Sequence, residues 1–174
     1  MKGVFTAAAL AAALSCGACS EPLSLTSPSS ARSGSSLESA SAGAGWHAAS
    51  VPFKGSLQGA QTFTPPSQVN GSATGTATHL GVFTVLFPHT VDFVTRTGRG
   101  TFTFTAANGD TLTADFTGQA QEGAIVSIEE HARITGGTGR FEGATGTFTV
   151  NRTFNPASGK TEGSFEGRIA LLSS

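Results

Sequence analysis

The chain has 174 residues, with 10 Lys and Arg against 11 Asp and Glu and a formal net charge of −1. This near-neutral balance gives no electrostatic basis for binding nucleic acid or an anionic membrane surface, because both need an excess of clustered positive charge. Charged residues make up only 12% of the chain, whereas Gly (23) and Phe (13) are frequent and Tyr is absent. Such a composition is typical of strands and turns, so it favours one all-β domain with tails.

Residues 1–19 contain both cysteines of the chain, Cys16 and Cys19. A lysine followed by an apolar run too short to span a bilayer predicts a signal peptide here, of the lipoprotein type. The four residues before Cys16, Ala-Ala-Leu-Ser, resemble a bacterial lipobox, which implies that the Cys16 thiol is acylated and becomes the new N-terminus. Cys19 is a second candidate for acylation. The remaining alternative is a plain signal peptide that is cleaved near Ala18 or Ser20.

Residues 20–50 are rich in Ser, Pro, Gly and Ala and contain almost no large apolar side chain. Such a segment cannot bury enough surface to offset the entropy lost on ordering. We therefore expect a flexible tether that holds a folded domain, residues 51–174, away from a membrane. Trp46, the single Trp, is interpreted as a packing lid at the domain start. The predicted location is a bacterial cell envelope, lipid-anchored at the outer membrane or cell surface; without the lipid, the protein would be secreted or periplasmic.

From residue 51 onward, apolar and polar residues alternate and turn signals follow at short intervals, which favours an antiparallel barrel or sandwich. Residues 101–105 read Thr-Phe-Thr-Phe-Thr, and Asn108-Gly109 after them is a strong hairpin signal. We predict eight strands, the third of them broken at Pro88, over residues 53–59, 73–80, 82–95, 99–106, 111–120, 124–135, 145–154 and 161–172. Eight antiparallel strands close into a barrel whose interior is filled by side chains or holds one small ligand. The domain has no cysteine, which excludes cysteine nucleophiles and Cys-based zinc sites there.

A glycine-rich corner, Gly136-Gly137-Thr138-Gly139-Arg140-Phe141, precedes Gly143-Ala144 and Gly146 at the start of the next predicted strand. This corner resembles that of the allene oxide cyclase and dirigent-type barrels, and the hairpin at 101–118 is similar to that of bacterial secreted relatives. The resemblance implies an eight-stranded, calycin-like barrel that is often trimeric and has a hydrophobic cavity open at one end. Plant members cyclise an epoxide or steer radical coupling, whereas the short bacterial members imply no activity.

The same corner is not a phosphate-binding loop, because no Lys-Ser/Thr follows it and no helix is expected to begin there. Its predicted task is to let Phe141 close one end of the barrel while the chain turns between two strands.

Three polar residues fall in rows of the predicted strands that are otherwise apolar and face the barrel interior: His89, Glu130 and Arg152. A buried carboxylate needs a partner and a guanidinium needs acceptors, so we predict that Glu130 and Arg152 bond to each other inside the barrel. One interpretation is a structural ion pair that fixes the register of the barrel. The other is a polar anchor for a ligand, with Glu130 as acid or base and Arg152 holding an anion or a carbonyl.

The candidate ligand-binding residues are those three together with the inward phenylalanines Phe83, Phe102, Phe104 and Phe116. A site of His79, His89 and Glu130 has no recognised metal-ligand spacing, so we predict neither a metal nor a cofactor. The leading hypothesis is a tethered barrel that binds a small hydrophobic ligand or serves as an envelope interaction module, with a homotrimer as one assembly.

Two alternatives remain. One is an isomerase or cyclase that acts on a hydrophobic substrate through Glu130 and Arg152, and the other is a purely structural barrel with a full interior. A cavity smaller than about 300 Å³ would exclude ligand binding.

Overall fold

The computed structural model describes residues 49–172, so the predicted signal peptide, most of the predicted tether, Cys16, Cys19 and Trp46 lie outside the described residues. The strands are β1 (Ser50–Thr64), β2 (Gln68–Ala77), β3 (Gly81–Leu86), β4 (His89–Asp92), β5 (Thr97–Ala106), β6 (Thr111–Gln121), β7 (Val126–Gly137), β8 (Thr145–Asn155) and β9 (Lys160–Ala170), with a 3-10 turn, η1, at Gly139–Phe141. Within the described range, no helix is long and apolar enough to cross a membrane.

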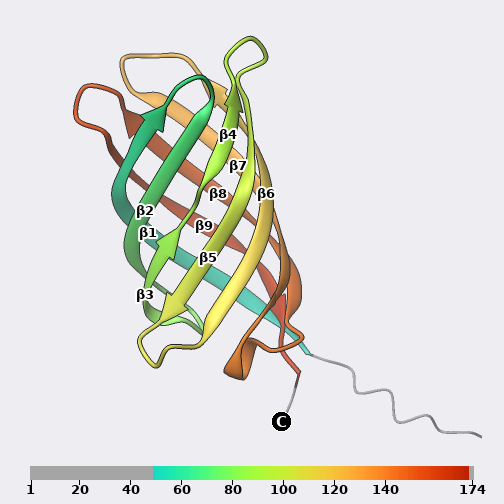
Figure 1. Cartoon of the computed structure of the whole chain (residues 1–174). Coiled ribbons are helices and arrows are strands. Elements are labelled where there is room, and N and C mark those ends of the chain that lie inside the picture. The colour runs from blue at the N-terminus through green and yellow to red at the C-terminus, as the bar shows by residue number, and fades with distance from the viewer. Residues whose placement is uncertain (1–48, 173–174) are drawn as a thin grey trace, which may run out of the picture. The chain divides into compact units, whose positions relative to one another are not determined.

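The strands form one closed antiparallel sheet (Figure 1). Each strand pairs with its neighbours in antiparallel register, and β1 pairs with both β2 and β9, so the sheet has no free edge there. β3 and β4 each pair with β2 and β5, and they share one position in the barrel, separated at Phe87-Pro88. The predicted eight-stranded antiparallel barrel, with its third strand broken at Pro88, is confirmed.

The first two strands differ from their predicted ranges. β1 runs from Ser50 to Thr64 rather than over 53–59, and β2 runs over Gln68–Ala77 rather than 73–80. The Ser, Gln and Thr residues at the ends of β1 look like loop residues in the sequence. The backbone groups of these residues nevertheless form hydrogen bonds, with β2 at the Thr64 end and with β9 at the Ser50 end. Closure of the barrel places β2 on one side of β1 and β9 on the other, so both extensions have a partner strand.

Aromatic side chains fill the interior between the two ends of the barrel. The rings of Phe53, Phe83, Phe104, Phe148 and Phe165 lie close together, with centroids 5.0–6.4 Å apart in the pairs that touch. Each fully buried Phe side chain contributes about 1.5–3 kcal/mol relative to exposure. This cluster therefore supplies much of the stability of the barrel and leaves no room for a ligand at its level.

The closed end of the barrel is formed by η1 and the turns beside it. Phe141 in η1 is 0% exposed and packs into the core, as the sequence predicted for this corner. Gly139 has a φ of 58°, and a Cβ there would lie 2.0 Å from the Asp110 carboxylate. Positive φ and missing space both favour glycine at this position.

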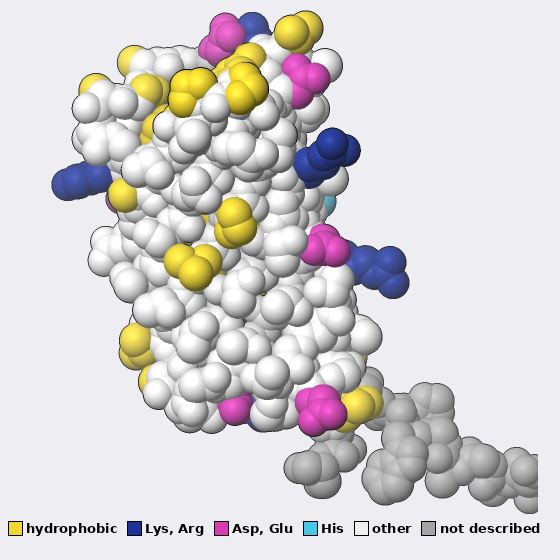
Figure 2. Space-filling view, in the orientation of Figure 1, with side chains coloured by type: hydrophobic (Ala, Val, Ile, Leu, Met, Phe, Trp, Pro, Cys, Tyr) yellow, Lys and Arg dark blue, Asp and Glu magenta, His cyan; other side chains and the backbone are white. Residues whose placement is uncertain are grey.

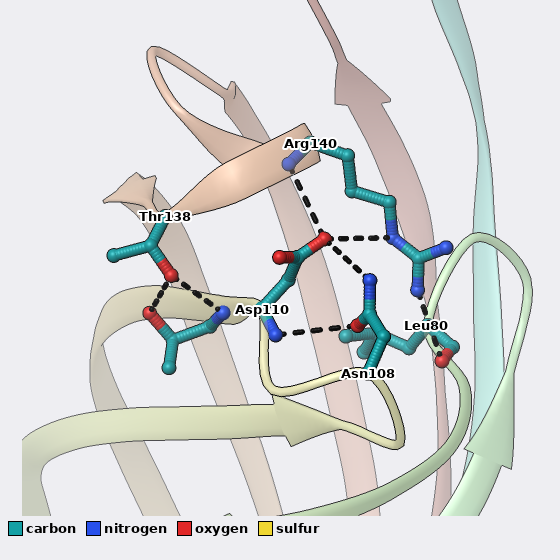
Figure 3. Close-up of polar contacts among 6 residues, drawn as sticks. Leu80, Asn108, Asp110, Thr138 and Arg140 are labelled. Atoms are coloured by element: carbon teal, nitrogen blue, oxygen red, sulfur yellow. Dashed lines mark hydrogen bonds and ion pairs between the residues drawn. The ribbon is translucent and has the colours of Figure 1, made fainter.

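A polar network holds η1 against the β5–β6 turn and the β2–β3 turn (Figure 3). The Asp110 carboxylate accepts hydrogen bonds from the Arg140 backbone N–H (3.3 Å) and from Asn108 Nδ2 (2.8 Å), and it lies 3.8 Å from Arg140 Nε. The Arg140 guanidinium in turn donates to the Leu80 carbonyl at 3.3 Å and lies over the Phe141 ring. The Asp110 carboxylate therefore connects the β5–β6 turn with η1 at this end.

The opposite, open end of the barrel carries exposed apolar side chains. The turns that follow β1, β4, β6 and β8 gather there, at the upper end in Figure 1. Phe63 is 50% exposed and Phe93 is 64% exposed, and their rings meet edge to face at 5.4 Å, with Val94 and Ile125 exposed on the neighbouring loops. Figure 2 shows hydrophobic side chains grouped at this end. The chain enters β1 and leaves β9 at the closed end, where Ser50 pairs with Ala170.

Candidate ligand-binding site at the open end

A cavity of about 430 Å³ lies inside the open end of the barrel. Its walls are largely apolar and are formed by Phe63, Val69, Val91, Phe93, Ala120, Val126, Ile128 and Phe154. Its inner end, which we call the floor, carries His89, Glu130 and Arg152. The volume lies above the lower bound of about 300 Å³ for ligand sites, so the barrel is not full at this level.

A larger hollow of about 1120 Å³ lies on the outer face of the barrel. It is lined mostly by exposed polar side chains, such as Gln58, Thr74, Gln119 and Asn151, and is open to solvent. Ligand sites enclose most of their ligand and combine apolar walls with a few convergent polar groups. The inner cavity meets that description and the outer hollow does not.

The predicted contact between Glu130 and Arg152 forms inside the barrel. Arg152 Nε donates to Glu130 Oε2 at 3.0 Å and Nη2 donates to Oε1 at 2.7 Å, so the pair is bidentate. Glu130 is 1% exposed and Arg152 is 4% exposed. In the β7–β8 register Arg152 pairs with Ile128, which places the two charged residues diagonally on one inward face.

Arg152 also binds β1 and β9. Its Nη1 donates to Gln61 Oε1 at 3.0 Å and to Thr161 Oγ1 at 3.2 Å, and the guanidinium lies 5.3 Å from the centre of the Phe87 ring. One side chain therefore connects β8 with β7, β1 and β9. This arrangement supports the interpretation of the pair as a device that fixes the barrel register.

His89 completes the floor and faces inward despite Pro88 before it. It is 6% exposed, its ring stacks on Phe87, and its Nδ1 lies 2.9 Å from the Phe87 carbonyl oxygen. A carbonyl oxygen only accepts, so Nδ1 carries the proton and Nε2 has the lone pair. Burial lowers the pKa of His89 below its usual 6.5, and the Arg152 charge adds to this, while the Phe87 hydrogen bond and the Glu130 charge oppose it.

The lowered pKa of His89 predicts that this residue destabilises the barrel in acid. As pH falls below about 6.5, the unfolded chain binds a proton on this histidine before the folded chain does, so the free energy of unfolding decreases until the folded pKa is passed. Above that range His89 is neutral in both the folded and the unfolded chain, so it does not contribute to the pH dependence of the free energy of unfolding. We expect His89→Phe to show a smaller loss of stability than the wild type between about pH 8 and about pH 5, measured by urea denaturation. His131→Phe, which replaces an exposed imidazole by a phenyl ring, is the matched control. Equal slopes for wild type and His89→Phe would contradict the prediction.

Glycines on neighbouring strands make room for the floor side chains. These glycines were not identified from the sequence. A Cβ at Gly118 would lie 2.7 Å from Glu130 Cγ, one at Gly163 would lie 2.6 Å from Arg152 Cβ, and one at Gly100 would lie 2.6 Å from His89 Cβ. Gly71 similarly leaves space for the Phe87 ring, at 1.9 Å. The available signal was a glycine at an inward strand position, opposite a large polar residue in the paired strand.

The four phenylalanines predicted as ligand contacts do not line the cavity. Phe83, Phe102 and Phe104 lie in the packed core, and Phe116 lies there too, with its ring centroid 5.8 Å from that of His89. The weaker metal candidate is also dispersed, because His79 lies in the β2–β3 turn at the closed end. Among residues 49–172 no group of three or more His, Cys, Asp or Glu side chains is placed to hold a metal ion.

Comparisons with known proteins give the fold. No family model and no curated protein matches the chain. Two solved structures, described as the pterocarpan synthase dirigent proteins PsPTS1 and GePTS1, match with a TM-score of 0.51 each, at 12% and 13% sequence identity. Each match covers 72% of this chain, with 97% of PsPTS1 and 92% of GePTS1. At such identities the likeness concerns the fold alone, and the chain therefore has the fold of a dirigent-like β-barrel.

Proposed function

We propose that this protein is a lipid-anchored component of a bacterial cell envelope whose barrel binds a small, mainly apolar molecule in the cavity at its open end. The observation that carries the proposal is the cavity of about 430 Å³, with apolar walls and a buried polar floor. The exposed phenylalanines beside the opening, Phe63 and Phe93, extend the apolar surface to the outside. We also propose that the chain belongs to the bacterial secreted branch of the allene oxide cyclase and dirigent superfamily.

Filling the cavity should abolish binding of an apolar probe. Ala120 lines the cavity on β6, and Ala120→Trp places an indole in that space. We expect the dissociation constant of the neutral fluorophore N-phenyl-1-naphthylamine to rise at least about tenfold in this variant, measured by fluorescence titration of the full chain. Thr117→Trp, which adds the same indole on the exposed face of the same strand, is the matched control. If both variants bind like the wild type, the probe does not occupy the cavity.

The lipid anchor is tested on the two cysteines. We expect metabolic labelling with palmitate to be lost in Cys16→Ser and kept in Cys19→Ser, because the four residues before Cys16 resemble a lipobox. Loss of labelling in Cys19→Ser alone would mean that Cys19 carries the lipid. Labelling of neither wild type nor variants would leave a secreted or periplasmic protein.

An isomerase or cyclase is the second candidate, supported by the position of Glu130 and Arg152 at the cavity floor. Both Glu130 oxygens accept hydrogen bonds from Arg152, and each keeps a second lone pair, so a base role for Glu130 requires the substrate proton to reach that lone pair beside the ion pair. Native mass spectrometry of the protein purified from its own envelope tests both candidates. A bound molecule that is released unchanged after incubation supports binding, and one that is converted to an isomer of equal mass, seen by chromatography, supports catalysis.

The same spectra report the assembly. A mass of three chains would support the proposed homotrimer, and an additional protein chain would support the envelope interaction module.

A further inference from the structure

His89 supplies the one feature of the floor that neither the ion pair nor the packing accounts for. Its Nδ1 is engaged by the Phe87 carbonyl, and Nε2 has no hydrogen-bond partner among the described residues. Within those residues, every side-chain nitrogen or oxygen that is fully shielded from solvent has a partner. Nε2 is therefore not shielded, and the space beside it is the cavity that His89 lines. The floor thus presents a hydrogen-bond acceptor to any occupant.

Arg152 does not offer a matching site for an anion. Its Nε and Nη2 bind the two oxygens of Glu130, and its Nη1 binds both Gln61 and Thr161. This leaves a single N–H, on Nη2, without a partner among the described residues. A carboxylate or phosphate is normally held by two parallel N–H groups of one guanidinium, and here Glu130 already occupies that position. Because Glu130 also cancels the charge of Arg152, an anionic ligand would gain little from the floor.

We propose that the cavity selects uncharged apolar alcohols, whose single O–H donates to His89 Nε2 while the hydrocarbon part contacts the apolar walls. The inference rests on the proposed function of the cavity and adds the chemical class of its ligand. A molecule with only an acceptor group cannot bond to Nε2, because two lone pairs would face each other, and it has only the single free N–H of Arg152 to bond to instead. Hydrocarbons gain the apolar contacts, but they displace water from the floor and leave Nε2 without a hydrogen-bond partner. Anions are disfavoured at the floor because they lose water there without gaining a free cation. Arg96, which also lines the cavity, is half-exposed and pairs with Glu122, so it adds little attraction for an anion.

The class is tested with four molecules built on one rigid bicyclic skeleton: borneol, an alcohol; camphor, a ketone; bornane, a hydrocarbon; and camphor-10-sulfonate, an anion. Each displaces N-phenyl-1-naphthylamine from the full chain in a competition titration. We expect borneol to bind about five- to tenfold more tightly than camphor or bornane, because one neutral hydrogen bond distinguishes them. Camphor-10-sulfonate should bind most weakly.

His89→Phe keeps an aromatic ring of similar size and removes the acceptor. In this variant we expect the preference of borneol over camphor to fall below about twofold, and bornane to bind more tightly than it does to the wild type, because no acceptor is left unpaired. His131→Phe, on the outer face, is the matched control and should keep the preference. A preference that survives in His89→Phe would overturn the proposal.

A measurement on the wild-type chain covers the case in which His89→Phe does not fold. Nitrogen-15 NMR of the histidine rings should show His89 with its proton on Nδ1, and the Nε2 resonance should move upfield when borneol binds but not when bornane binds. A proton on Nε2 in the free protein, or equal affinities for borneol, camphor and bornane, would overturn the inference while leaving cavity binding intact. If none of these molecules nor the fluorophore binds, the proposed function itself fails.

Discussion

Replacing Arg152 by Leu is expected to lower the free energy of unfolding by about 3–5 kcal/mol, because the change leaves the Glu130 carboxylate buried without its partner. Glu130 is 1% exposed, and both of its oxygens depend on Arg152. The same substitution removes the hydrogen bonds to Gln61 and Thr161, so four neighbouring strands lose a common connection. Chemical denaturation at neutral pH, with the denaturant slope compared between variants, measures the loss.

The double variant Glu130→Gln/Arg152→Leu separates the unpaired charge from the lost contacts. If most of the cost comes from the stranded carboxylate, the double variant should be more stable than Arg152→Leu alone, because a neutral amide is cheaper to bury than a charge. Lys54→Leu is the exposed control: Lys54 lies 3.3 Å from Glu166 with both side chains largely exposed, and such pairs contribute about 0–1 kcal/mol. An Arg152→Leu cost as small as that of Lys54→Leu would mean that water reaches the floor in the folded protein.

The face that each strand residue presents could be predicted from the sequence, and its height in the barrel could not. Alternation places Glu130 and Arg152 inward, and the structure has them inward and in contact. The same alternation places Phe83 and Phe104 inward but cannot tell that they lie in the packed core, below the cavity.

Height depends on how far each strand is shifted against the next around the closed barrel. One such shift occurs in the β6–β7 pair between Thr113 and Ala114, beside Gly136. A glycine in a strand indicates that an irregularity is possible there, but it does not give the size of the shift. The position of an open space follows from the sum of these shifts, so it becomes visible only in the folded chain. The inward glycines Gly118 and Gly163 make room for the Glu130 and Arg152 side chains, so they indicate the floor of the cavity and not the open space above it.

The second large loss of stability is expected from a substitution at the closed end of the barrel. Phe141→Ala should cost about 3–5 kcal/mol, because Phe141 is fully buried and the surrounding network keeps the neighbouring backbone from collapsing into the space it leaves. Thermal and chemical denaturation measure the cost. Arg140→Gln is the control for the polar network: it removes the half-exposed contact to Asp110 and the cation over the Phe141 ring, and it should cost about 1 kcal/mol or less. A small effect of Phe141→Ala would mean that η1 covers the barrel end without being part of its cooperative core.

The same variant also tests whether the two ends of the barrel act independently. The packed phenylalanine cluster lies between Phe141 and the cavity, and Phe141 is not among the residues that line the cavity. Because packed aromatic cores deform little, we expect Phe141→Ala to bind N-phenyl-1-naphthylamine with wild-type affinity at temperatures well below its melting point. A matched loss of affinity and stability would mean instead that the cavity depends on the closed end. In that case the Phe cluster transmits strain along the whole barrel, and the floor of Glu130, Arg152 and His89 is held in place from below as well as by its own hydrogen bonds.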